Sequence, residues 1–230
     1  MKSKKSKDDV DQKTKEGKDA IDQGTTPKDV EDAKNTTDTA VKDIVDQSTL
    51  QDAKNKAKKD LEAKVDETKK AIDALPGLSQ EIKDKAKGEI DNALSNGLQN
   101  IETGKSIEDV NKVVSETKTE MDAIKDALIK ENFESLEKLK DDKKANLNAE
   151  VRESLKKQSI NLRTYHKADK DKAKKVIDQT VNNASKELDK APTPSDINTI
   201  YNQGKTDIGN VVVKAELDDA KIKAVADLKA

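Results

Sequence analysis

The chain lacks cysteine and tryptophan, and its only aromatic residues are Phe133, Tyr165 and Tyr201. Without cysteine, neither a disulfide nor a thiolate metal site can form, although this absence fits both a reduced cytosol and an extracellular protein. Small-molecule pockets usually have apolar and aromatic walls, and this sequence has little material to build them. We therefore expect no cofactor.

Candidate catalytic groups are also scarce. His166 is the single histidine, and it lies beside Tyr165 in a predicted turn, where a plain surface position is the simpler interpretation. Adjacent acids such as Asp141 and Asp142 point in different directions on a helix. No calcium-loop, phosphate-loop or nucleophile motif is present. The sequence predicts no catalytic, cofactor-binding or metal-binding residues, and hence a protein that is not an enzyme.

Nucleic acids and membranes are poor candidates as partners. The basic residues are lysines apart from Arg152 and Arg163, and acids balance them to a net charge of −2. Such a surface offers neither a basic patch nor aromatic rings on which bases could stack. No apolar run approaches the roughly 20 residues of a transmembrane helix, so we expect no membrane insertion within this segment.

What the sequence does contain is interleaved charge and regularly spaced aliphatic residues. Charged residues make up 40% of the chain, with acids and lysines alternating three or four positions apart as on solvated helix faces. Leu, Ile, Val and Phe account for only 46 of the 230 residues, which is enough for thin cores and not for large ones. We expect a folded monomer.

One pattern of apolar residues occurs three times, which indicates a tandem array of one folding unit. Equivalent residues are 80 positions apart between the first and second copies and 87 apart between the second and third. The three series are Val10, Ile21, Val30, Ala33, Val41 and Ile44; Ile90, Ile101, Val110, Val113, Met121 and Ile124; and Ile177, Leu188, Ile197, Ile200, Ile208 and Val211. Because seven residues make two turns at about 3.5 residues each, the insertion is predicted to keep the same stripe facing inward.

Each repeat is predicted to hold three helices. In the middle repeat, the first covers residues 50–75 and ends at Pro76-Gly77, and the second covers residues 79–103 and ends at Gly104. The third helix of every copy opens with a hydroxyl residue followed three positions later by an acid, which is the pattern of a capping box. These pairs are Thr26 and Asp29, Ser106 and Asp109, and Thr193 and Asp196.

Small residues recur inside the second helix, as Gly17, Gly97 and Ala184. Glycine there costs up to about 1 kcal/mol of helix propensity relative to alanine, so its recurrence indicates a close helix crossing. The alternative is a tolerated surface glycine.

No linker separates the repeats, so the third helix of one repeat is predicted to continue into the first helix of the next, with residues 45–49 as the weakest point. The fold class is all-α: tandem three-helix-bundle repeats joined by long shared helices in an elongated rod. The segments are 1–45, a partial repeat with the second and third helices; 46–124, a complete repeat; 125–211, a complete repeat with the seven-residue insertion; and 212–230, the first helix of a next repeat. Because the sequence opens and closes in mid-repeat, we expect a piece of a longer protein.

The middle repeat resembles a known family. The phrase AIDALPGLS at residues 71–79, followed by AKGEIDNA at 86–93, SIEDV at 106–110 and MDAI at 121–124, is similar to the three-helix repeat, a domain of unknown function, of giant cell-wall-anchored surface proteins of Gram-positive bacteria. Adhesins of the extracellular-matrix-binding-protein type carry related modules. The third repeat departs from the pattern, with LRTY at 162–165 in place of the Leu-Pro-Gly-Leu turn. The resemblance implies an extracellular stalk linked to adhesion and biofilm, anchored to the cell wall through parts of the parent protein outside this chain.

Three functions follow from these observations. The first is a structural stalk or spacer segment of a bacterial cell-surface adhesin, which projects a binding head from the cell wall. The alternative is a helical binding module for a host serum or matrix protein, or for surface proteins of neighbouring cells, with Tyr201 and residues 211–213 as the first place to look. The third is a lysine- and alanine-rich stress protein that is disordered in water, which the phased capping boxes argue against.

Overall fold

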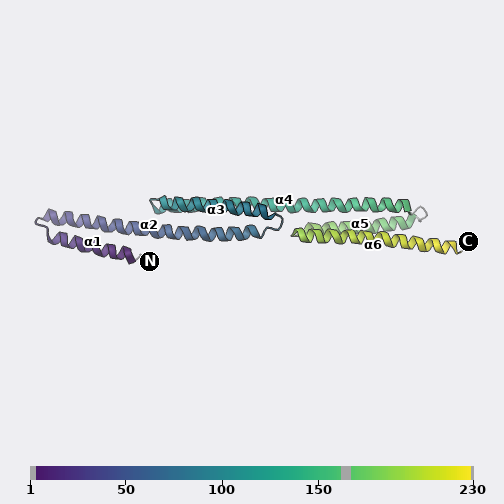
Figure 1. Ribbon diagram of the computed structural model, residues 1–230, viewed down its shortest axis with the longest axis horizontal. Coiled ribbons are helices and arrows are strands. Elements are labelled where there is room, and N and C mark those ends of the chain that lie inside the picture. Colours follow the sequence, from purple (N-terminus) through teal and green to yellow (C-terminus); the bar gives the residue numbers. More distant parts are fainter. Residues whose placement is uncertain (1–3, 162–166, 229–230) are drawn as a thin grey trace. The chain divides into compact units, whose positions relative to one another are not determined.

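The computed structural model describes residues 4–161 and 167–228, and every secondary-structure element in these ranges is an α-helix (Figure 1). The helices are α1 (Lys4–Asp22), α2 (Pro27–Asp73), α3 (Gln80–Thr103), α4 (Ile107–Asn161), α5 (Lys167–Lys190) and α6 (Pro194–Asp227). The predicted all-α class is confirmed. His166, Arg163 and the tetrapeptide at 162–165 lie outside the described residues.

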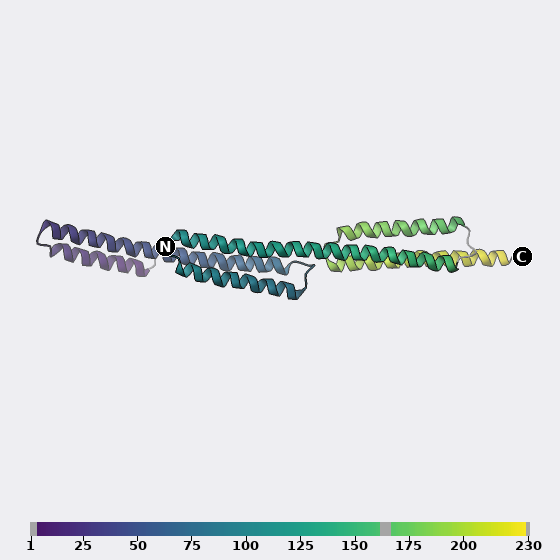
Figure 2. The same ribbon diagram turned by 90° about the horizontal axis from the view of Figure 1, so that it is seen from above.

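The helices form two compact units. The first consists of Met1–Ile72 and Glu81–Asp126, and the second of Asp73–Gln80 and Ala127–Ala230. In the first unit, α1 lies beside the first part of α2, and α3 lies beside both the later part of α2 and the first part of α4 (Figures 1 and 2). In the second unit, α5 and α6 pack with the later part of α4 (Figure 2).

The prediction that successive repeats share long helices is confirmed by α2 and α4. Helix α2 runs for 47 residues and α4 for 55, each without a break. Residues 45–49 are helical throughout, because no proline or glycine interrupts α2 after Pro27. One helix therefore supplies the third helix of one repeat and the first helix of the next.

Each unit has a narrow aliphatic core, in which members of the second or third predicted series pack with residues of the first helices. Leu61, Ile101 and Val110 are fully buried in the first unit, where they pack with Ala57. Leu147, Leu188 and Ile197 are fully buried in the second unit and belong to its core. Burial of such side chains contributes roughly 1.5–3 kcal/mol each, so a short stripe per helix supports a bundle this thin.

The predicted capping box has both of its bonds at the starts of α2 and α4, and one of the two at the start of α6. Ser106 accepts a bond from the Asp109 amide at 3.0 Å, and its own amide donates to the Asp109 carboxylate at 3.0 Å. Thr26 and Asp29 repeat this reciprocal pair at 3.2 and 2.9 Å. At α6 the Asp196 amide again donates to the Thr193 hydroxyl, at 3.2 Å. These bonds hold the pKa of Asp29 and of Asp109 below the usual range, chiefly through the Thr26 and Ser106 side chains.

Gly104 follows α3 directly, as predicted, but its backbone is not left-handed, since no described glycine has a positive φ. Its amide donates to the carbonyl of Asn100 at 3.1 Å. A Cβ at Gly104 would lie 3.2 Å from the Val110 side chain. The glycine therefore makes room for Val110 and does not provide a left-handed helix end.

The seven extra residues of the third repeat fall in two places in the structure. Leu136 lies 12 positions after Ile124, whereas its counterpart Leu50 lies 6 after Ile44, so six of the extra residues fall within α4. The seventh falls between Val151 and Ile177. The sequence pattern predicts that all seven residues together add two turns to the helical stripe. In the structure, the buried residues of the first helices are 86 positions apart between the second and third repeats, and those of the second helices are 87 apart, so the seven residues do not form one insertion.

The lengthened part of α4 holds the turn Asp73–Gln80 within the second unit. The Gly77 amide donates to the side-chain oxygen of Asn132 at 2.7 Å, and the Ser135 hydroxyl donates to the Gly77 carbonyl at 2.8 Å. A Cβ at Gly77 would lie 2.9 Å from the Asn132 carbonyl oxygen and from Leu136. Close approach of α4 therefore requires glycine here.

Candidate functional site

The described residues contain no group of three or more His, Cys, Asp or Glu placed to hold a metal ion. Within this part of the chain, no helix has the length and apolar character to cross a membrane. Tyr201, singled out from the sequence, is half-buried against the core of the second unit. The Lys143 amine lies 4.5 Å from the centre of its ring, which is a cation–π contact. Tyr201 therefore contributes to packing within the second unit.

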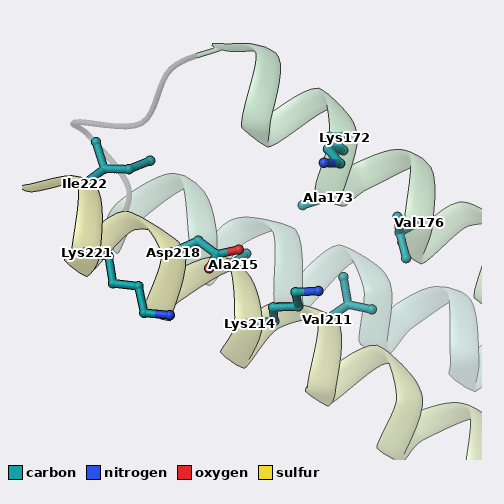
Figure 3. A pocket seen from close by; sticks show the side chains of 9 residues that line it. All are labelled: Lys172, Ala173, Val176, Val211, Lys214, Ala215, Asp218, Lys221 and Ile222. Atoms are coloured by element: carbon teal, nitrogen blue, oxygen red, sulfur yellow. The ribbon is translucent and has the colours of Figure 1, made fainter.

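A groove between α5 and α6 lies near the place predicted from the sequence. Its volume is about 560 Å³. Figure 3 shows Val176 of α5 and Val211 of α6 on opposite sides of it, with Ile222 farther along α6. Its walls are Lys172, Ala173 and Val176 from α5, and Val211, Lys214, Ala215, Asp218, Lys221 and Ile222 from α6 (Figure 3).

The groove combines aliphatic and charged side chains. Four of its nine lining residues are charged, namely Lys172, Lys214, Asp218 and Lys221, and the other five are alanine, valine or isoleucine. Its lining residues include no hydroxyl, thiol or imidazole group. Val211 was predicted here from the sequence, whereas Val176 and Ile222 were missed, because each looks like an ordinary aliphatic position on its own helix.

A pair of lysines recurs where the first helix meets the end of the second. The buried Lys54 amine of α2 donates to the backbone carbonyl of Glu102 in the last turn of α3 at 2.7 Å. Lys58, one turn later, pairs with the Glu102 carboxylate. The carbonyls at a helix C-terminus have no partner within the helix and carry partial negative charge, so an ammonium group stabilises them.

The same lysine clamp occurs in the second unit. The buried Lys140 amine donates to the carbonyl of Asp189 in the last turn of α5 at 3.1 Å, and Lys144 pairs with the Asp189 carboxylate. Sequence reasoning missed both clamps because single lysines in a highly charged chain carry little information. The signal that could have found them is the recurrence of Lys54 and Lys58 as Lys140 and Lys144, both 86 positions on.

The predicted close helix crossing is present in all three copies. A Cβ on Gly17 would lie 2.2 Å from the Thr37 hydroxyl oxygen, and a Cβ on Gly97 would lie 2.7 Å from that of Thr117. In the third copy the glycine is on the other helix, where a Cβ on Gly204 would lie 3.2 Å from the Cβ of Ala184. The alternative of a tolerated surface glycine is wrong for Gly17 and Gly97, since both are buried.

An ion-pair cluster joins α2 to α4 in the first unit. Asp122 of α4 accepts from Lys125 at 2.7 Å and from Lys64 of α2 at 2.9 Å. The hydrogen bond from Lys125, followed by that from Lys64, lowers the pKa of Asp122 to about 2. The cluster fixes helix packing, and nothing about it favours proton transfer near neutral pH.

Comparisons with known proteins identify one part of the chain. No curated protein and no solved structure matches the chain. Residues 53–129, which cover the later part of α2, all of α3 and the first part of α4, match the family Domain of Unknown Function (DUF1542).

Proposed function

We propose that this chain is a structural spacer, in which tandem helical repeats hold other parts of a protein at a set distance. The observation that carries the proposal is the continuity of α2 and α4, each of which serves two successive repeats. A shared helix leaves no flexible linker between repeats, so a force or a displacement at one end is transmitted along it. No catalytic step is part of this function.

We place the spacer at the cell surface of a Gram-positive bacterium, as a stalk segment of a wall-anchored adhesin that projects a binding head. The match of residues 53–129 to DUF1542 supports the repeat type, and the sequence resemblance supplies the surface setting. Antibodies raised against the purified chain should label intact cells that make the protein, and protease treatment of those cells should remove the signal. Labelling that appears only after lysis would contradict the placement.

Small-angle X-ray scattering tests the spacer itself. A compact globule of this length has a radius of gyration of about 17 Å, and we expect a value more than twice that. A compact particle would overturn the proposal. The shared helix can be tested with Lys130→Pro, since Lys130 is exposed on α4 and proline there removes a helix hydrogen bond and clashes with the preceding turn.

We expect Lys130→Pro to broaden the scattering distance distribution while the helical circular-dichroism signal is nearly unchanged. Lys130→Ala is the matched control, because it removes the same side chain and leaves the helix intact. If the proline and alanine variants scatter alike, continuity of α4 does not set the separation of the repeats.

A second candidate is a helical binding module for a host serum or matrix protein. The groove between α5 and α6 favours it, because Val176 and Ile222 are exposed aliphatic side chains that line it. Binding of the chain to immobilised serum and matrix proteins should be lost in Val176→Asp and retained in Ile129→Asp, which changes a similarly exposed residue on α4. Equal binding by both variants would exclude the groove as the contact surface.

A further inference from the structure

The middle repeat contains a chemically labile dipeptide, Asn96-Gly97, inside α3. Asn96 is the only asparagine in the chain that a glycine follows. The backbone nitrogen after an asparagine can attack the carbon of its side-chain amide, and glycine hinders this attack least because it has no Cβ. Asparagine is accordingly counted among the thermolabile residues.

The two residues of this dipeptide have different surroundings. The Asn96 side chain is exposed and in contact with solvent, whereas Gly97 is buried at the crossing of α3 and α4. A Cβ on Gly97 would lie 2.7 Å from the Thr117 hydroxyl oxygen and 3.1 Å from a methyl carbon of Leu61. The crossing therefore requires glycine, and this requirement places the least hindered backbone nitrogen directly after Asn96.

The helix blocks the reaction while it is intact. Both residues lie well inside α3, and in an α-helix each backbone N–H donates to the carbonyl four residues earlier. Helical backbone angles also hold the Gly97 nitrogen away from the side-chain carbon of Asn96, because ring closure needs a more extended backbone at Asn96. The attack therefore requires that this part of α3 unfolds first.

We propose that Asn96 is a site of spontaneous deamidation that reacts when the middle repeat opens. The Gly97 nitrogen bonds to the side-chain carbon of Asn96, and its proton passes through solvent to the side-chain nitrogen, which leaves as ammonia. The result is a five-membered cyclic imide. Water then adds to either carbonyl of the imide and opens the ring to aspartate or to isoaspartate. The steps need no oxidant, reductant or cofactor.

Isoaspartate prevents the opened repeat from closing as before. It adds one carbon atom to the main chain between residues 96 and 97, so the hydrogen-bonded rings that span this point exceed the 13 atoms of an α-helix. It also displaces the Gly97 backbone, where Thr117 and Leu61 leave no room. A repeat that has been held open is thus marked by a negative charge and a weakened helix. This property goes beyond the proposed spacer function and does not depend on it.

The other two copies of the crossing lack this combination of residues. Asn183-Ala184 holds the same place in the third repeat, 87 positions later, with alanine after the asparagine. Glu16-Gly17 holds it in the first repeat, with glycine but without a side-chain amide. Asn183 is therefore a matched control within the same chain.

Peptide mapping by mass spectrometry, after incubation of the full chain at mildly alkaline pH, tests the proposal. In urea, Asn96 should deamidate faster than Asn183, because the Cβ of Ala184 hinders ring closure. In native buffer the rate at Asn96 should fall at least about tenfold, the factor that corresponds to about 1.4 kcal/mol of opening free energy. Equal rates at Asn96 in native buffer and in urea would overturn the proposal.

Two matched core variants show which repeat must open. Leu61→Ala truncates a fully buried side chain beside Gly97, and Leu147→Ala truncates its fully buried counterpart in the second unit, 86 positions later. Leu61→Ala should accelerate deamidation of Asn96 at least about tenfold, because loss of a buried leucine raises the population of the open repeat. Leu147→Ala should accelerate it less. An equal acceleration by both variants would contradict the proposal.

Urea below the unfolding transition provides the same test if Leu61→Ala does not fold. The deamidation rate at Asn96 should rise with urea concentration, since urea increases the open fraction of the unaltered chain. A rate that stays constant up to the transition would mean that opening does not control the reaction.

Asn96→Asp separates the added charge from the altered main chain. Asn96 is exposed, and the residues three and four positions away along α3 are uncharged, so this variant should be nearly as stable as the unaltered chain. Chain that has been deamidated in urea, refolded and shown by mapping to hold isoaspartate should unfold at a lower urea concentration than Asn96→Asp. Equal midpoints would show that isoaspartate leaves the helix intact and would overturn its role as a mark.

Discussion

Gly97 of α3 faces Thr117 of α4 so closely that a Cβ on Gly97 would lie 2.7 Å from the Thr117 hydroxyl oxygen and 2.9 Å from its methyl carbon. The equivalent pair in the third repeat is Ala184 and Gly204, in which the small residue has changed helices. The two helices can thus cross this closely only when the two facing side chains are small together. The size that one position tolerates therefore depends on the residue at the other.

The first prediction concerns this coupling. Alanine is favoured over glycine in a helix by about 1 kcal/mol, but overpacking typically costs about 1–3 kcal/mol, and Thr117 is β-branched and cannot easily move aside. Gly97→Ala should therefore lower the free energy of unfolding by about 1 kcal/mol in urea melts followed by circular dichroism.

In a Thr117→Gly background, the change in the free energy of unfolding caused by Gly97→Ala should have the opposite sign. The substitution should then stabilise the chain by about 1 kcal/mol, because the double variant has alanine facing glycine, as in the third repeat. A double-mutant cycle measures the difference. If Gly97→Ala has the same effect in both backgrounds, the crossing is not limited by these two side chains.

The second prediction concerns the lysine clamp. Lys54→Met keeps the apolar stem of the side chain and removes the amine that bonds the Glu102 carbonyl at 2.7 Å. We expect a loss of about 1–2 kcal/mol in the free energy of unfolding, since a charged donor is lost and a carbonyl is left without it. Lys56→Met, at an exposed position of the same helix, is the control and should be nearly neutral.

The third prediction concerns acid stability. The lowered pKa of Asp122 means that its ion pairs contribute stability above the unfolded-state pKa of about 3.9, and that this contribution is lost as the pH falls through the folded value of about 2. Because 42% of the side chain is exposed, solvent screening limits it to about 1 kcal/mol or less.

Thermal melts of the chain and of Asp122→Asn across this pH range check the prediction. The chain should be the more stable of the two at pH 6, and the difference should shrink as the pH falls below the unfolded-state pKa and be lost below about pH 2, where the folded-state carboxyl of Asp122 becomes protonated. Asp60→Asn removes a charge at an exposed position and serves as the control. A difference between the chain and Asp122→Asn that is independent of pH would show that the ion pairs do not produce it.

The fourth prediction concerns Thr68, a buried residue of α2 whose hydroxyl has no hydrogen-bond partner among the described residues. Thr68→Val keeps the shape of the side chain and replaces the hydroxyl by a methyl group, which removes the cost of burying an unpaired polar atom. We expect a gain of about 1 kcal/mol in the free energy of unfolding. Thr119→Val, at an exposed position whose hydroxyl bonds the Ser115 carbonyl, should give no gain.

Local rules explain why much of this fold was predictable. The Ser106 and Asp109 pair forms from residues three positions apart, so the sequence contains all of its partners. The continuity of α2 and α4 likewise follows from the absence of helix breakers within a single segment. The place of the glycine at 97 predicted a crossing, although not the residue that it crosses.

Contacts between distant segments were not predictable in the same way. Lys54 and Glu102 are 48 positions apart, and only the packed bundle brings the amine to that carbonyl. The groove beside Val176 and Val211 exists because α5 and α6 meet there, although each valine alone resembles any other core position. Similarly, only the buried residues show that six of the seven extra residues fall within α4.

The sequence by itself determined the repeat, the helix starts and the positions of small residues, because each depends on spacing along one chain segment. The tertiary structure decided which members of the repeat are covered. Val30 and Val110 hold the same place in the pattern, yet the first is 38% exposed and the second has no exposed surface. Burial depends on a neighbouring helix from elsewhere in the chain, which is why two equivalent valines differ.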